Sequence, residues 1–211
     1  MYSLMNESSS LLLDELKTKE ISRFAALHQQ LTTTDVSINP EYHREYKAHW
    51  GMHAAFLDEV FYKKYFRRLE DTKSATTLDV HGTLRDVSMF AEHDTGKGIQ
   101  FSFATKLLTT IDPRLPVYDS KVAAFYFFEA PPTKQSAEKR LDAWLSFYDF
   151  LRAEYAHISE AGLLQPAIQA FCGRFPNAAT WPEERIIDVL IWATVSSLES
   201  GLLHTGKGRH H

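Results

Sequence analysis

Two glycines flank a lysine in the segment DTGKGIQ, residues 94–100. A Gly-x-Gly turn between two helices exposes consecutive backbone N–H groups, and the helix that follows points its positive end in the same direction. Such a turn can bind a phosphate group without any side chain, and Lys97 would add a positive charge. The same pattern is also typical of a plain tight turn between two packed helices, so both interpretations stay open at this point.

A second residue that could do chemistry is Asp119, which follows Pro-Val-Tyr and opens a predicted helix. An aspartate at this place accepts hydrogen bonds from the free N–H groups of the first helical turn. Those bonds and the helix dipole favour the ionised carboxylate. An ordinary N-cap aspartate has the same context, so the position alone does not separate a cap from a catalytic group.

Glu45, His49 and His53 recur every four residues, which places them on one face of a helix that runs through all three. Two histidines at this spacing can bind a divalent metal, with a further ligand from His43 or Asp58. No fuller motif such as His-Glu-x-x-His is present, and packing or surface histidines are the more common reason for the spacing.

Two charged segments allow two interpretations each. Asp188 lies in the apolar stretch IIDVLIW, where a charge is costly unless it is paired. It is expected to form an ion pair with an arginine or to make a polar contact in a ligand pocket. The basic run KKYFRR, residues 63–68, fits either phosphate contacts or a solvent-exposed helix face.

The elements that must position these side chains are helices. Apolar residues recur with the 3.6-residue helical period through most of the chain, and no segment has a convincing strand pattern. We predict an all-α fold of about eight helices, counted from the printed sequence. They cover roughly 9–31, 40–69, 78–93, 101–111, 119–126, 134–157, 166–172 and 180–200. The last is expected to begin with a capping box, Thr180 to Glu183, and to end at Gly201.

The composition limits the class of protein. The chain has 211 residues, a net charge of −4 and one cysteine, so it can form neither an internal disulfide nor a cysteine-based zinc site. No stretch is long and apolar enough to span a bilayer, and the N-terminus is not expected to be a signal peptide. We expect a cytoplasmic protein with no membrane partner. The tail 206–211 resembles the start of a purification tag.

Taken together, residues 94–122 resemble the signature of the helix-hairpin-helix DNA glycosylase superfamily. The segments GIQFSFATKLL and PVYDSKV are most similar to those of bacterial 8-oxoguanine-glycosylase-like proteins. The resemblance implies a two-lobed helical fold and an enzyme that excises a damaged or modified base from DNA. It further implies double-stranded DNA with a flipped base as the partner, a monomer, and no cofactor or metal.

The resemblance assigns roles to single residues. It implies that a hairpin grips the DNA backbone and that Asp119 stabilises the cationic sugar. We expect Lys121 to contact DNA as well. The residues that match the hairpin are Gly96, Lys97, Gly98 and Ile99.

Gln100 departs from the pattern of the superfamily's bifunctional members. In those proteins a lysine nucleophile stands two residues after the second hairpin glycine, where this chain has Gln100. The chain is therefore expected to be monofunctional, with water attacking the sugar, unless Lys97 or Lys106 substitutes. Lys106 lies about 120° around the helix from Gln100, so its reach into the same site depends on its long stem swinging round; it stays a candidate catalytic residue beside Asp119 and Gln100.

A flipped base needs a pocket with stacking walls. The candidates are Phe125, Tyr126, Trp181 and Trp192, each of which could instead belong to the core.

We expect residues 1–47 to join a C-terminal lobe, 131–205, with a central lobe at 48–130. Two alternatives stay open: a non-catalytic helix-hairpin-helix protein that binds nucleic acid, and a helical metal-dependent enzyme that uses His49 and His53.

Overall fold

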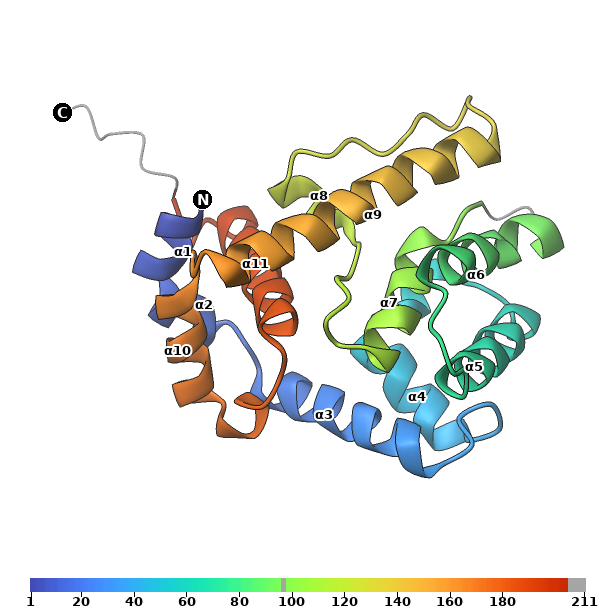
Figure 1. Ribbon diagram of the computed structural model, residues 1–211, viewed down its shortest axis with the longest axis horizontal. Coiled ribbons are helices and arrows are strands. Elements are labelled where there is room, and N and C mark those ends of the chain that lie inside the picture. Colours follow the sequence, from blue (N-terminus) through green and yellow to red (C-terminus); the bar gives the residue numbers. More distant parts are fainter. Residues whose placement is uncertain (96–97, 205–211) are drawn as a thin grey trace.

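The computed structural model describes residues 1–95 and 98–204, which form helices and no strand (Figure 1). The all-α prediction is confirmed. The α-helices are α1 Tyr2–Glu7, α2 Ser9–Asp14, α3 Thr18–Thr33, α4 Pro40–His49, α5 Glu59–Lys73, α6 Val80–Thr95, α7 Phe101–Ile111, α8 Ser120–Phe125, α9 Ala137–Glu160, α10 Gln165–Arg174 and α11 Glu183–Glu199. Two short 3₁₀ turns, η1 Met52–Ala55 and η2 Pro176–Ala178, complete the described elements. None of these helices is both long and apolar enough to cross a membrane.

Three predicted boundaries are wrong. The helix expected over 9–31 is interrupted before α3, where Lys17 has an extended backbone. The helix expected over 40–69 ends at His49, because Gly51 and Phe56 both adopt left-handed φ angles of 62° and 48°. The residue at the N-cap of α11 is Pro182 rather than Thr180.

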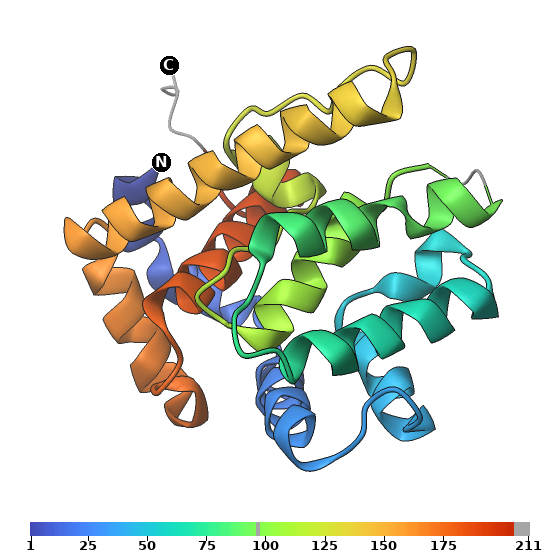
Figure 2. The same ribbon diagram turned by 45° about the vertical axis from the view of Figure 1, so that its right-hand side comes forward.

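The buried apolar side chains form two clusters. The first cluster joins α1 and α2 to α10, α11 and the C-terminal half of α9, and the second joins α4, α5, α6 and α7 to the N-terminal half of α9. Helix α9 therefore contributes to both, with Tyr148 in the second cluster and Leu151 in the first, and it runs along both groups of helices (Figures 1 and 2). The lobe boundaries at 48 and 130 remain a prediction.

Helices α6 and α7 pack against each other, and α6 continues through Thr95, inside the segment predicted to be a turn. The N–H of Gln100 donates to the carbonyl of Ser88 at 2.8 Å, which closes the start of α7 onto α6. Gly98 has a φ of 81°, a conformation that glycine adopts without strain. Gly96 and Lys97 lie outside the described residues.

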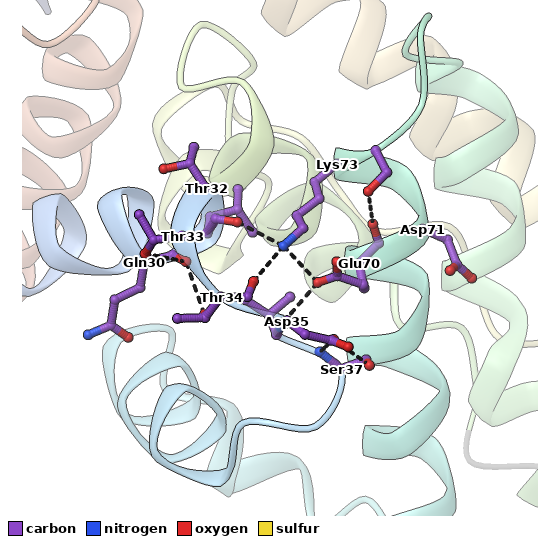
Figure 3. A network of polar contacts seen from close by, with 12 residues as sticks. Gln30, Thr32, Thr33, Thr34, Asp35, Ser37, Glu70, Asp71 and Lys73 are labelled. Atoms are coloured by element: carbon purple, nitrogen blue, oxygen red, sulfur yellow. Dashed lines mark hydrogen bonds and ion pairs between the residues drawn. The ribbon is translucent and has the colours of Figure 1, made fainter.

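A polar network ties the end of α3 to α5 (Figure 3). The Lys73 ammonium donates to the carbonyl oxygens of Leu31 at 2.9 Å and Thr34 at 2.6 Å, and it pairs with Glu70 at 2.8 Å. Glu70 in turn accepts the N–H of Val36 at 2.8 Å. The network satisfies the carbonyl groups that the end of a helix leaves without partners.

Candidate functional site

Asp119 caps α8, as the sequence predicts. Its Oδ1 accepts the N–H groups of Lys121 and Val122, both at 2.9 Å. The loop before it is also fixed, because the N–H of Tyr118 donates to Thr105 Oγ1 at 3.0 Å. The carboxylate is half-buried and therefore held at a defined place without being cut off from solvent.

Asp119 lines a pocket of about 410 Å³. This volume is within the range of roughly 300–1,000 Å³ that small-molecule sites occupy. The walls come from segments far apart in the sequence: the α2–α3 junction, the end of α4, α7, the loop before α8, and α11. The polar side chains used below are Glu20, His49, Lys106, Asp119, Arg185 and Asp188.

Lys106 shares this pocket with Asp119, although it lies about 120° around α7 from Gln100. Its ammonium donates to the carbonyl of Trp50 at 3.0 Å and lies over the ring of Phe103 at 5.3 Å from the centroid. Burial lowers the pKa of Lys106, and the nearby Asp119 carboxylate opposes that shift. The directions around α7 alone could not reveal this, because the pocket also depends on where α4 and α11 pack.

Gln100 is placed differently. It stands at the N-cap of α7, and its side-chain amide donates to the carbonyl of Gly98 at 3.2 Å. The described part of the pocket wall includes Lys106 and does not include Gln100.

Asp188 forms the expected ion pair with an arginine, and it is also a polar group of the pocket wall. Its Oδ2 accepts from the Arg185 guanidinium at 2.5 Å, and its Oδ1 accepts from Tyr155 at 3.0 Å and from the N–H of Val117 at 3.3 Å. It also lines the pocket. Burial raises the pKa of Asp188, while the Arg185 guanidinium opposes the rise. The pair thus anchors the loop that carries Asp119.

Arg185 is enclosed by aromatic rings. Its guanidinium carbon lies 4.4 Å from the ring centroid of Phe24, 5.2 Å from that of Trp50 and 5.9 Å from that of Trp181. Such contacts attract a cation through the negative face of the ring. No local sequence pattern indicates this cage, because its members come from α3, the end of α4, the segment after η2, and α11.

His49 lines the pocket as a neutral imidazole. Burial, followed by repulsion from Arg185, Arg23 and Lys106, lowers the pKa of His49 to about 3. Neither ring nitrogen has a hydrogen-bond partner among the described residues, and Nδ1 lies 3.8 Å from a Glu20 oxygen.

The helix face that the metal alternative requires is not formed, because α4 ends at His49 and His53 lies in η1 with an exposed side chain. Glu45 pairs with Arg23 at 3.1 Å. Among the side chains that the structure describes, which leave out residues 92–97 and 205–211, no three from His, Cys, Asp or Glu lie close enough together to hold a metal ion.

Of the four candidate stacking residues, Trp192 lines the pocket and is 43 % exposed. Lys121 lies over it, with its ammonium 5.2 Å from the ring centroid, and pairs with Glu199 at 2.5 Å. Phe125 is buried in the first cluster, and Tyr126 and Trp181 pack against that cluster.

The remaining predicted DNA-binding residues are Gly98, described above, and Ile99, which packs against the second cluster.

A comparison of the chain with protein-family models found no match, and neither the curated proteins nor the solved structures gave a significant one. The helix-hairpin-helix resemblance therefore rests on residues 94–122 alone.

Proposed function

We propose that this protein is a DNA N-glycosylase that removes a damaged or modified base flipped out of double-stranded DNA. The observation that supports this most is the position of Asp119, which caps α8 at a pocket and follows the α6–turn–α7 pair. The proposal places the base in that pocket, stacked on Trp192, and the hairpin 96–99 and Lys121 against the DNA backbone. A monomer in the cytoplasm suffices for this function.

The chemistry asks for a fixed negative charge beside the sugar. When the bond between C1′ and the base breaks, the base leaves with the electron pair and positive charge develops on the sugar. In the described part of the chain only Oδ1 of Asp119 bonds to the backbone, which leaves Oδ2 to face that charge. Water then adds to C1′ and loses a proton, leaving an abasic site.

Lys106 supports a second candidate, a bifunctional glycosylase. Because burial favours its neutral amine, the amine can attack C1′ in place of water. The amine nitrogen bonds to C1′ as the base leaves with the electron pair of the glycosidic bond, and the nitrogen then loses a proton. The C1′–O4′ bond of the sugar ring breaks next, O4′ keeps that electron pair and takes up a proton, and a protonated imine joins Lys106 to C1′. This candidate puts the nucleophile six residues beyond Gln100, where the superfamily resemblance does not place it.

The test is a panel of labelled duplexes that carry different altered bases. The parent protein is expected to release a base from at least one duplex, and Asp119→Asn should lower the rate by about 100-fold or more, since the amide keeps the cap but not the charge. Asp58→Asn is the matched control, because Asp58 caps α5 through the N–H of Phe61 at 2.9 Å and does not line the pocket.

Binding of DNA with no base release from any duplex would instead support the non-catalytic alternative. Equal rates for the parent and Asp119→Asn would reduce Asp119 to a helix cap.

A further inference from the structure

The two indole rings that line the pocket already face cations of the protein. Arg185 lies over Trp50 and Lys121 lies over Trp192, each 5.2 Å from the ring centroid. Aromatic faces are the usual means by which a protein holds a cationic ligand without a carboxylate. Here Arg185 already lies over Trp50 and Lys121 over Trp192, and these two cations would repel a positively charged ligand.

Three of the four carboxylates that line the described pocket lie beside a basic side chain. Both oxygens of Glu20 accept from Arg23 at 2.8 Å, and Asp188 is held by Arg185. Asp119 faces Lys106, and its charge is needed at the sugar. Glu15 lies at the pocket edge as an exposed side chain next to Leu16 and the equally exposed Lys17.

His49 lies beside the same basic side chains. It is 8 % exposed, lies 3.8 Å from a carboxylate oxygen, and is nevertheless disfavoured as a cation by burial and by three basic side chains. A cationic ligand placed beside it would meet the same desolvation and the same repulsion.

We propose that the pocket accepts an uncharged base and excludes a cationic, N-alkylated one. An uncharged base can stack on Trp192, which is 43 % exposed, and accept hydrogen bonds from Lys106 without placing a further positive charge beside Lys106 and Arg185. This inference rests on the proposed function, and it names the class of altered base that the pocket takes.

The experiment compares pairs of methylated isomers that differ in their charge at neutral pH. Deoxynucleosides of 1-methyladenine and 3-methylcytosine are cationic at neutral pH, whereas those of N6-methyladenine and N4-methylcytosine are uncharged. Binding to the full chain is followed by tryptophan fluorescence, with Trp192→Phe to identify the signal from the pocket. The uncharged isomer of each pair is expected to bind at least about tenfold more tightly.

Variants of one pocket cation sharpen the test. Lys106→Met should reduce the preference for the uncharged isomer several-fold, while Lys139→Met, which removes an exposed lysine of α9, should leave it unchanged. Equal or tighter binding of the cationic isomers to the parent protein overturns the inference, as does failure of every isomer to bind.

The same four bases are then tested in duplex DNA alongside the panel of altered bases. A preference for uncharged isomers without base release from any duplex contradicts the glycosylase proposal and leaves the pocket inference standing. Base release together with equal binding of the charged and uncharged isomers supports the glycosylase proposal and overturns the pocket inference.

Discussion

Burial of Lys106 removes water from its ammonium group, and the resulting fall in pKa makes the neutral amine available at a lower pH than in an exposed lysine. If the amine attacks the sugar, borohydride should trap a covalent protein–DNA adduct on any duplex that the protein processes. The adduct yield should rise with pH, because only the neutral amine attacks. The adduct should disappear in Lys106→Met and persist in Lys97→Met.

The opposite result is equally informative. Strand breaks that appear only after alkali, with no trapped adduct at any pH, would assign the attack to water, as Gln100 suggests.

His49 predicts how stability depends on acid. Its pKa falls from an ordinary 6.5 to about 3 on folding, so between these values the unfolded chain binds more protons than the folded one. The free energy of unfolding should therefore decrease as the pH falls below 6.5, by about 2 kcal/mol between pH 7 and pH 5 from this residue. Denaturant titrations should show a shallower pH dependence for His49→Gln, whereas His53→Gln, which replaces an exposed side chain of η1, should match the parent.

The residues of the site differ in how far their roles follow from the sequence. The cap at Asp119 is a local feature, since it depends on the next three residues, and the sequence predicts it. The positions of Lys106, Arg185 and His49 depend on contacts between α3, α4, α7 and α11, for which the sequence has no local signal. Trp50 was missed for the same reason, although its place just before Gly51 indicates a helix end.

At the scale of elements, two glycines offer a matched pair of substitutions. A Cβ atom on Gly82 would lie 2.0 Å from Asp79 Oδ2, and the N–H of Gly82 donates to Asp79 Oδ1 at 2.9 Å at the start of α6. Gly82→Ala should therefore lower the free energy of unfolding by about 1–2 kcal/mol, because the cap must move. Gly173→Ala, in α10 with no atom within 4 Å of the new Cβ, should be neutral or raise stability by up to about 1 kcal/mol. Equal effects in chemical unfolding would contradict the steric reason.

The sequence predicts a helix well where the apolar 3.6-residue period stops at a glycine or proline that marks the end of the helix. Helix α7 begins after a glycine turn and ends before Pro113, and α11 ends at Gly201, whose φ of 73° fits the expected left-handed cap. The predicted helix over 40–69 failed, because the helical period continues across Gly51 while the chain turns there. Periodicity describes which face is apolar, and it does not show where a helix bends to reach a second neighbour.

At the scale of the whole molecule, α9 should make unfolding cooperative. Leu145 belongs to the second cluster and Leu151 to the first, on the same continuous helix. Leu145→Ala and Leu151→Ala should each lower the stability of one shared transition, by about 2–5 kcal/mol, as large-to-small core substitutions do. Circular dichroism and tryptophan fluorescence should give coincident curves for both variants. Two separate transitions would show that the clusters unfold independently.

The first cluster is also closed by the two ends of the chain. Met5 and Leu12 pack with Ile187 and Leu203, whereas the second cluster draws only on residues 27–148. During synthesis on the ribosome, the second cluster can therefore assemble while the C-terminal helices are still being made. The N-terminal helices must wait for partners that are translated later. The pocket needs α11 as well, so a nascent chain has no complete pocket until α11 has been synthesised.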